Sequence, residues 1–362
     1  MQIADPLEPA YATPKRLNTG APYCIIRKNP KIGGRNPVLK RVAVWGATGF
    51  IGQHVVQAFV DRQIPVLALT RRPVISELST PRSLVRWMSI PEGDAGIDAF
   101  AEAIRHVGVV FNLVGSSGAV ASNLNPIASL DANCHVQARF LQACELSRSK
   151  PHIVFASSRL VYGTPDSLPV TENCSLQPKS FYAAHKVALE HYHRIASLRS
   201  VISYTICRIS NSYGSQDTQP GHWRGFIDAL IEKGCRGIPM EIYGDGRQLR
   251  DYIYIDDLTD ALYRCAVRPE ARNETFNIGN GESLSILDAA QIISECTGTP
   301  IVHLPWEEEA ALVESGDYVV DIAKARTLLG FRPKFSFTST VQELIRNRRL
   351  FAARGRAMST PA

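Results

Sequence analysis

The stretch KRVAVWGATGFIGQHVVQAFV, residues 40–60, decides the fold class of this chain. It starts with a short apolar run (42–45), passes through three glycines and continues with apolar residues at helical spacing (55–60). A second apolar run, IPVLALT, follows at residues 64–70. An apolar strand, a glycine-rich turn, an amphipathic helix and another strand are the parts of a βαβ unit. We therefore expect a parallel sheet to begin here.

The three glycines lie between the expected strand and helix and are spaced GxxGxxG. We expect Gly46 to allow the tight turn, Gly49 to admit a pyrophosphate and Gly52 to let the helix pack against the strand. The helix N-terminus would direct its free N–H groups at the phosphates. The turn is thus predicted to bind a dinucleotide, NAD or NADP. The alternative is a tight turn without a ligand.

The end of the second strand bears on which dinucleotide fits. NAD sites usually carry an acid there, which accepts hydrogen bonds from the ribose 2′-OH. Thr70 stands at this position and is followed by Arg71 and Arg72. Arginine can hold a 2′-phosphate with charge-assisted hydrogen bonds, whereas an acid would repel it. We expect NADP to be favoured over NAD, the alternative being that both arginines are solvated loop charges.

Strands and helices continue to alternate beyond residue 70. Residues 106–115 (HVGVVFNLVG) predict a strand that ends in a glycine-serine turn, residues 131–146 a helix, and residues 151–158 (PHIVFASS) a buried strand. Repeated units of this kind predict an α/β fold with a doubly wound parallel Rossmann sheet. Its ligands are expected at the carboxyl ends of the strands.

The stretch FYAAHKVALE, residues 181–190, places Tyr182 and Lys186 four positions apart. On a helix these side chains lie on one face, one turn apart, so both can act on one small volume. They are therefore candidates for an acid–base pair. The same spacing also fits an ordinary surface helix, in which Lys186 pairs with Glu190 and contributes a few tenths of a kcal/mol.

Several motifs in this order, with Ser158 at the end of a strand and 24 residues before Tyr182, resemble one known family. It is the extended short-chain dehydrogenase/reductase family, and within it the NAD(P)-dependent nucleotide-sugar epimerase/dehydratase group. The resemblance runs from about residue 41 to 345. It depends on Asn133 and on the segments GATGFIG (46–52), SSRLVYG (157–163), YAAHK (182–186), RISNSYG (208–214), IYGDGRQLRDYIYIDDL (242–258), FNIGNGESLSI (276–286) and DIAKARTLLGF (321–331).

The resemblance implies catalytic roles for three residues. Tyr182 would take a proton from a sugar hydroxyl while hydride leaves the carbon, and Ser158 would hydrogen-bond the same oxygen. Lys186 would hold the cofactor ribose. A free tyrosine has a pKa of about 10. We expect the Lys186 ammonium and the positive nicotinamide ring to lower the pKa of Tyr182.

The resemblance also implies two sets of binding residues and no metal site. The expected cofactor-binding residues are Gly46, Thr48, Gly49, Phe50, Ile51, Gly52, Arg71, Arg72, Leu113, Val114, Gly115, Asn133, Tyr182, Lys186 and Ile209. The expected substrate-binding residues are Ser157, Ser158, Asn211 and Arg250. Arg250 would clamp a diphosphate; the alternative is an ion pair with Asp251 or Asp256.

The chain departs from the pattern of the group at four places, one of which is Ser215, where a proline is common after the segment RISNSYG. Relatives that dehydrate the sugar carry an Asp-Glu pair directly after the active-site hydroxyl, where this chain has Arg159 and Leu160, so dehydration is not expected. Glu314 and Ser315 stand where an arginine and a proline are usual, and an acid there would weaken a diphosphate site. The loop NLVGSSG (112–118), beside the nicotinamide, replaces a His-x-Ala-Ala pattern.

Three functions fit these motifs. We expect an epimerase that oxidises a carbon of a nucleotide-diphosphate sugar, lets the transient keto intermediate turn and returns the hydride to the other face. An NADP(H)-dependent sugar or carbonyl reductase or dehydrogenase is the alternative, and Arg71 and Arg72 favour it. A non-catalytic NAD(P)-binding protein is the third, against which the intact Ser158, Tyr182 and Lys186 argue. The motifs do not identify the sugar, the base or the reacting carbon.

The net charge of +6 is concentrated near the N-terminus. Residues 1–40 hold seven Lys/Arg and two acids, a balance of +5, which leaves about +1 for the remaining 322 residues. A nucleic-acid-binding protein should carry its charge on the folded body, so we expect no nucleic-acid partner. Six prolines, three glycines and no periodic apolar pattern indicate that residues 1–39 form a disordered basic leader.

The eight cysteines are scattered, without a CxxC pair or a Cys/His spacing suited to zinc. They predict reduced thiols in a cytoplasmic protein with no metal. No apolar run is long enough to cross a membrane, so we expect no membrane partner.

The motifs also predict how the chain is divided into domains. We expect an NAD(P)-binding Rossmann domain at residues 40–209 and about 251–281, a smaller C-terminal α/β substrate-binding domain at about 210–250 and 282–345, and a flexible tail at 346–362. The resemblance further implies a homodimer that pairs helices around 131–146 and 181–198. The first of these contains apolar Val136, Phe140 and Leu141, which could equally face the sheet.

Overall fold

The structure is a computed structural model that describes residues 39, 41–71, 83–214 and 225–358. The leader expected at residues 1–39 lies outside the described residues except for Leu39, and Arg72 also lies outside them. The described residues belong to one compact unit. The division of this unit into a cofactor domain and a substrate domain stays a prediction.

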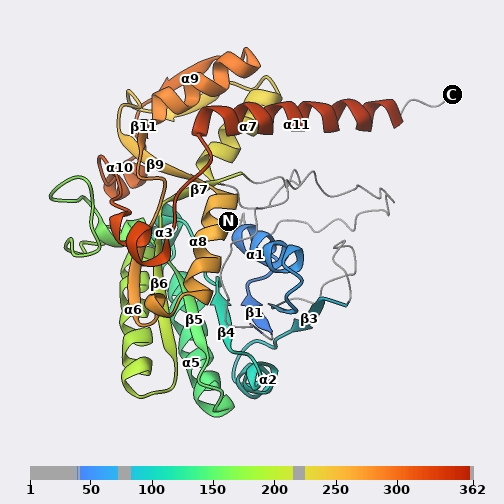
Figure 1. Cartoon of the computed structure of the whole chain (residues 1–362). Coiled ribbons are helices and arrows are strands. Elements are labelled where there is room, and N and C mark those ends of the chain that lie inside the picture. The colour runs from blue at the N-terminus through green and yellow to red at the C-terminus, as the bar shows by residue number, and fades with distance from the viewer. Residues whose placement is uncertain (1–38, 40, 72–82, 215–224, 359–362) are drawn as a thin grey trace, which may run out of the picture. The chain divides into compact units, whose positions relative to one another are not determined.

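A parallel sheet of seven strands, in the order β10-β6-β5-β4-β1-β2-β3, forms the centre of this unit (Figure 1). The strands are β1 Val42–Trp45, β2 Val66–Thr70, β3 Val85–Ser89, β4 Val109–Asn112, β5 His152–Ser158, β6 Ser203–Ile209 and β10 Glu274–Ile278. From β1 the chain adds strands outward in one direction to β3 and then, from β4, in the other. This reversal defines a doubly wound sheet, so the fold class predicted from the sequence is confirmed.

Helices cover both faces of the sheet. On one face α1 contacts α8, and Phe59 packs on Phe111 of β4 with ring centroids 5.2 Å apart. On the other face α2, α5 and α6 share a core with the strands, in which Trp45 stacks on Phe140 at 5.0 Å. The helices of this part are α1 Phe50–Asp61, α2 Ala95–Ile104, α3 Ala119–Leu124, α4 Pro126–Leu130, α5 Val136–Ser147, α6 Phe181–Leu198 and α8 Ile255–Val267.

The helix predicted at residues 131–146 begins differently from the expectation. Residues Asp131–His135 form a π-helical turn, and α5 continues from Val136. Phe140 is buried in the core and Val136 and Leu141 pack against it, so these apolar residues face the sheet rather than a partner subunit.

The remaining elements build two small sheets and a helical layer. They are β7 Asn211–Tyr213, β8 Met240–Tyr243, β9 Leu249–Tyr254, β11 Ser283–Ser285, β12 Ile301–Leu304, α7 Phe226–Cys235, α9 Ile286–Thr297, α10 Glu308–Val313 and α11 Phe337–Met358. Strands β11, β9 and β7 form one sheet and β12 and β8 the other. Helix α11 extends up to Met358, and Arg348 lies 3.4 Å from the Glu232 carboxylate of α7. The flexibility expected for residues 346–362 stays a prediction.

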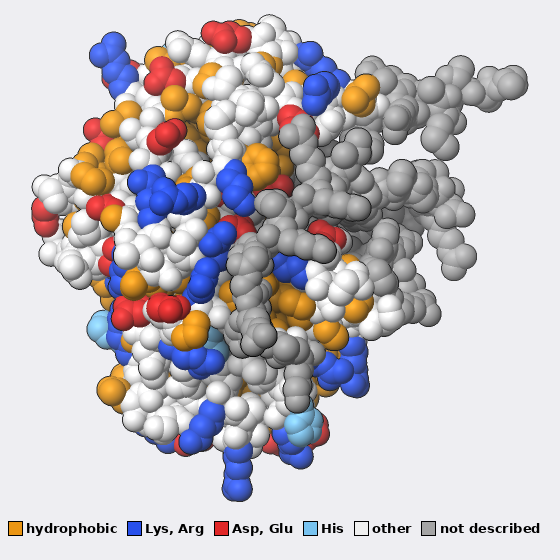
Figure 2. All heavy atoms as spheres, viewed as in Figure 1, with side chains coloured by type: hydrophobic (Ala, Val, Ile, Leu, Met, Phe, Trp, Pro, Cys, Tyr) orange, Lys and Arg blue, Asp and Glu red, His pale blue; other side chains and the backbone are white. Residues whose placement is uncertain are grey.

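No helix of the described residues is long and apolar enough to cross a membrane. The seven cysteines within the described part of the chain all carry free thiols. Basic and acidic side chains are interspersed over the face of the molecule that Figure 2 shows. A cytoplasmic location stays a prediction.

Candidate active site

The glycine-rich turn connects the carboxyl end of β1 to the N-terminus of α1. Gly46 has a φ of +89°, and its carbonyl accepts the Gly49 N–H at 3.0 Å. Gly52 packs so closely on the turn that a Cβ there would lie 2.0 Å from the Gly46 oxygen. Thr48 and Gly49 are exposed, and the first turn of α1 has neither an acidic residue nor a side-chain cap. These features fit a bound pyrophosphate, because the free N–H groups and positive end of the helix face it.

Replacing Gly52 with alanine should destabilise this turn by about 1–3 kcal/mol, because the new Cβ would collide with backbone that cannot rotate away. The affinity for a dinucleotide should fall by about tenfold or more. Gly108→Ala is the matched control, because no atom lies within 4 Å of a Cβ at Gly108. Thermal unfolding and calorimetric titration with NAD measure both effects. Equal affinities for the two variants would contradict the close packing at Gly52.

A second loop meets this turn at the carboxyl end of β4. The Leu113 N–H donates to the Trp45 carbonyl at 3.0 Å, and a Cβ at Gly46 would lie 3.2 Å from Val114. Farther along the loop, a Cβ at Gly115 would lie 2.7 Å from Asn133 Oδ1 and 3.6 Å from Lys186 Nζ.

The side-chain oxygen of Asn133 is available to accept a hydrogen bond from a bound ligand. Its Nδ2 donates to the Ser129 carbonyl at 2.9 Å, whereas its Oδ1 is buried and has no hydrogen-bond partner among the described residues. A buried acceptor of this kind usually has a partner, which a ligand or a water can supply. The glycine turn, the Gly115 loop and Asn133 together therefore fit a dinucleotide cofactor.

The three predicted catalytic residues lie together. Ser158 ends β5, and its hydroxyl hydrogen-bonds Tyr182, the second residue of α6. Lys186 is buried one turn further along α6, where its Nζ donates to the Ala156 carbonyl at 2.8 Å and lies 5.7 Å from the centre of the Tyr182 ring. The start of α6 is fixed by the Ser122 hydroxyl, which accepts the Tyr182 N–H at 3.0 Å. The arrangement can move a proton at the Tyr182 hydroxyl.

The pKa values of this pair differ from the expectation. Burial raises the pKa of Tyr182 to about 12, although the hydrogen bond from Ser158 acts in the opposite direction. Burial lowers the pKa of Lys186 to about 8, and the charges of Glu190 and Cys134 raise it only in part. In the chain alone the pKa of Tyr182 is therefore raised rather than lowered. The lowering expected in the presence of the positive nicotinamide ring stays a prediction.

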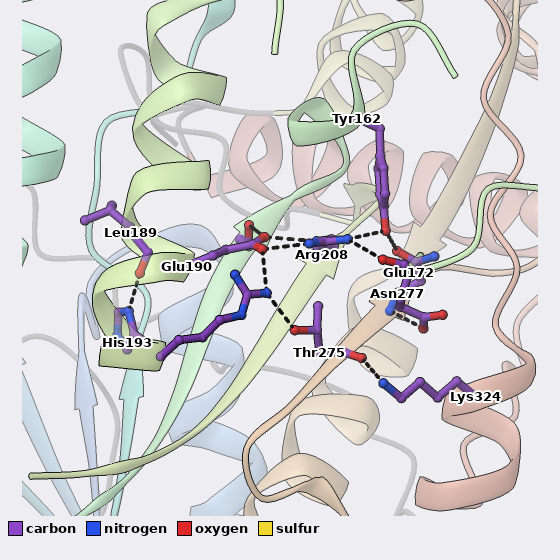
Figure 3. A network of polar contacts seen from close by, with 11 residues as sticks. Tyr162, Glu172, Leu189, Glu190, His193, Arg208, Thr275, Asn277 and Lys324 are labelled. Carbon is purple, nitrogen blue, oxygen red and sulfur yellow. Dashed lines mark hydrogen bonds and ion pairs between the residues drawn. The ribbon is translucent and has the colours of Figure 1, made fainter. Parts of the chain in front are cut away.

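The alternative of a surface ion pair between Lys186 and Glu190 does not apply. Glu190 is fully buried and accepts two hydrogen bonds from Arg208 of β6, at 3.0 and 2.8 Å (Figure 3). The Ser157 hydroxyl donates to the same carboxylate at 2.7 Å. Ser157, expected to bind substrate, is thus buried and committed to this network because its hydroxyl points into the core.

The network continues on the far side of Arg208. Its guanidinium donates to the Tyr162 hydroxyl at 2.9 Å and to the Glu172 carbonyl at 3.0 Å, and Tyr162 donates in turn to Asn277 at 2.6 Å. Figure 3 shows these side chains joining α6, β6 and β10. The network fixes the carboxyl end of β5 and the first half of α6, which carry the predicted catalytic residues.

The expected substrate residues Asn211 and Arg250 also have partners within the chain. Arg250 pairs with Glu314 at 2.5 Å, and not with Asp251 or Asp256. Asn211 uses both ends of its amide: Nδ2 donates to the Asp251 carbonyl at 2.9 Å, and Oδ1 accepts from Arg159 at 3.0 Å. Both side chains are therefore occupied, which differs from their expected direct roles.

The other expected cofactor residues lie on α1, β6 and the segment after β2. Phe50 and Ile51 begin α1 and are half-buried, while Ile209 ends β6 and is buried. The side chain of Arg71 is 59% exposed, with its Nη1 3.9 Å from a Glu92 carboxylate oxygen. A carboxylate at this distance would oppose a 2′-phosphate.

The comparisons with known proteins agree with this geometry. Residues 42–279, more than half of the chain, match the profile of the NAD dependent epimerase/dehydratase family. The chain belongs to this family. This protein is therefore an NAD(P)-dependent enzyme of the extended short-chain dehydrogenase/reductase type, as predicted from its motifs.

Three proteins of known name are similar to this chain over most of its length. A UDP-glucose 4-epimerase of Mycolicibacterium smegmatis is 29% identical over 84% of this chain and 97% of its own. A dTDP-4-dehydro-6-deoxyglucose reductase of Escherichia coli is 29% identical over 84% and 96%. The solved structure of MoeE5, in complex with UDP-glucose and NAD, aligns with a TM-score of 0.74 and 28% identity, covering 86% of this chain and 99% of MoeE5.

The residues of the buried network that holds β5 and α6 in place were not identified from the sequence. Arg208, Tyr162 and Asn277 all lie within recognised segments, RISNSYG, SSRLVYG and FNIGNGESLSI. Their places in these segments indicated that they matter for the site. Their mutual contacts span 46 and 115 residues, however, and could not be inferred from local spacing.

Proposed function

We propose that this enzyme is an NAD-dependent epimerase of a nucleotide-diphosphate sugar, acting through a transient keto intermediate. The observation that carries the proposal is the contact of the Ser158 hydroxyl with Tyr182, close to a buried Lys186 whose Nζ lies 3.6 Å from the position of a Cβ at Gly115. The UDP-glucose 4-epimerase relative and the UDP-sugar bound by MoeE5 support the substrate class.

The chain's own residues would handle the proton. Bound NAD supplies reversible hydride acceptance at its nicotinamide ring. The ring's positive charge and the Lys186 ammonium favour the phenolate of Tyr182. Tyr182 then takes the proton of the sugar hydroxyl and later returns it to the same oxygen, while Ser158 holds that oxygen by a hydrogen bond. Arg159 and Leu160 offer no carboxylate to eliminate water, which favours epimerisation over dehydration.

A reductase is the second candidate, because one relative is the reductase of Escherichia coli. An epimerase returns its hydride and can keep one cofactor, whereas a reductase must exchange its cofactor in every turnover. The preference for NADP expected from Arg71 and Arg72 has no support among the similar structures, four of which name bound NAD. We therefore favour NAD.

Identifying the nucleotide released by the denatured protein tests the proposal. Stoichiometric NAD, together with interconversion of UDP-glucose and UDP-galactose without added cofactor, is the expected result. NADPH-dependent reduction of a keto sugar, with empty protein after purification, would favour the reductase instead. Failure to bind either cofactor would leave a non-catalytic protein.

We also propose that the enzyme forms a homodimer through α6. Exposed apolar side chains follow one side of this helix, including Phe181, Tyr192 and Ile195, with Leu198 86% exposed at its end. Neighbouring α4 adds Ile127, which is 71% exposed. A contiguous apolar surface of this kind marks an interface.

Ile195→Glu should convert the dimer to a monomer, because the new carboxylate would be buried without a partner. Light scattering after size exclusion measures the mass. Leu312→Glu, at an equally exposed position on α10, is the control and should remain dimeric. A wild-type protein that is monomeric would overturn the proposed interface.

A further inference from the structure

Arg159 is a cation beside the reacting groups that has only neutral direct partners. It follows Ser158 in the chain and begins the 3-10 turn Arg159–Tyr162. Its Nε donates to Asn211 Oδ1 at 3.0 Å and its Nη1 to Ser315 Oγ at 3.1 Å. Its guanidinium carbon lies 5.2 Å from the centre of the Tyr318 ring. Among the described residues no carboxylate forms an ion pair with it.

Arg250, the expected diphosphate clamp, is already satisfied. Its Nη2 pairs with Glu314 at 2.5 Å, and its Nη1 donates to the Gly316 and Leu249 carbonyls at 2.6 and 2.8 Å. Its side chain is 7% exposed. An anionic ligand would have to displace the Glu314 carboxylate, whose side chain is 25% exposed, from this ion pair to reach Arg250.

The charges around Arg159 favour an added anion. Burial and, to a smaller extent, the nearby Arg250 charge lower the pKa of Arg159 to about 10, although Tyr318, Glu314 and Tyr252 act in the opposite direction. The Asp251 carboxylate, also nearby, accepts the N–H groups of Asn280 and Gly281 at 2.9 and 2.7 Å. Glu314 already pairs with Arg250, and the Asp251 carboxylate already accepts backbone N–H groups. Neither forms an ion pair with Arg159, so an anionic ligand would supply its counter-ion.

We propose that Arg159 is the anion-binding residue of the substrate site, while the Arg250–Glu314 pair and Asn211 position it. The proposal rests on the proposed nucleotide-sugar substrate. Guanidinium binds the oxygens of phosphate or carboxylate with charge-assisted hydrogen bonds. Two groups of such a substrate have this chemistry: the diphosphate of the nucleotide and a carboxylate on the sugar. MoeE5 has been solved with both a neutral and an acidic sugar nucleotide, UDP-glucose and UDP-glucuronic acid.

Calorimetric titration of the NAD-loaded enzyme with UDP, UDP-glucose and UDP-glucuronic acid tests the role of Arg159. Arg159→Gln should weaken binding by about 10- to 100-fold, because one charged hydrogen-bonded contact is lost. An equal loss for all three ligands identifies the diphosphate as the anion. A loss confined to UDP-glucuronic acid identifies the sugar carboxylate.

Two further variants separate the role of Arg159 from the loss of any nearby positive charge. Arg247→Gln removes an exposed arginine whose Nε lies 3.7 Å from an Asp245 carboxylate oxygen, in the same segment as Arg250, and should leave all three affinities unchanged. Arg159→Lys keeps the charge but loses the planar fork, and should retain part of the affinity.

Unchanged affinities of Arg159→Gln for all three ligands would overturn the role of Arg159 alone. A wild-type enzyme that binds none of the three, although it is loaded with NAD, would overturn both the nucleotide-sugar proposal and the role of Arg159. The two failures are thus distinguished by the behaviour of the wild-type protein.

Discussion

Replacing Tyr182 with phenylalanine should lower the turnover of UDP-sugar epimerisation by about two to four orders of magnitude. The substitution removes the hydroxyl that Ser158 hydrogen-bonds and that is proposed to exchange a proton with the sugar. The fold should be retained, because the ring stays in place and the Ser158 hydroxyl still accepts the Leu160 N–H at 3.2 Å. Removing a buried group whose pKa is about 12 leaves no charge unpaired.

Steady-state kinetics and calorimetric titration with NAD measure this effect. The matched control is Tyr192→Phe, the same substitution on the same helix at a side chain that is 38% exposed. Its turnover should equal that of the wild type. Near-normal turnover of Tyr182→Phe, with NAD affinity unchanged, would show that another group carries the proton.

The parts of the site that local sequence encodes were predictable. The turn Gly46–Gly52 was found because its glycines must satisfy geometry within six residues of chain, and the structure confirms the βαβ unit around it. Tyr182 and Lys186 were placed together because one helical turn separates them, and α6 does present both beside Ser158. Periodicity and spacing act over such short distances, so they can be read without tertiary information.

The parts that depend on distant partners were not predictable. Glu190 was matched with Lys186 by helical spacing, but its real partner Arg208 lies on a neighbouring strand and buries the pair. For Arg250 the alternative to the expected diphosphate clamp was an ion pair with Asp251 or Asp256, whereas Glu314 pairs with it from 64 residues away. The choice between such partners depends on the packing of α6 on β6 and of the C-terminal loop on β9, which no local pattern specifies.

Replacing Glu190 with glutamine should reduce the free energy of unfolding by about 3–5 kcal/mol, because it leaves the Arg208 charge buried without its partner. Glu190 is 0% exposed and Arg208 4%. Urea denaturation measures the loss. The control Glu145→Gln breaks an exposed pair with Arg199, whose side chains are 47% and 61% exposed, and should lose about 1 kcal/mol or less. Adding Arg208→Met to Glu190→Gln should recover part of the stability, because the uncompensated charge is then gone.

The pH dependence of stability and turnover distinguishes this buried charge from simple packing. Burial raises the pKa of Glu190, but Arg208, Ser157 and Arg194 together outweigh burial and hold the pKa below its ordinary value of 4.5. The ion pair therefore stabilises the wild type above the unfolded pKa, and this stabilisation is lost as the pH falls through the folded pKa. Glu190→Gln should lack that acid-side loss. Because the Glu190 charge also raises the pKa of Lys186, the variant's turnover should decline at lower alkaline pH than that of the wild type. Turnover with an unshifted alkaline limit, or a stability loss no larger than that of Glu145→Gln, would show that Glu190 neither carries the network nor tunes Lys186.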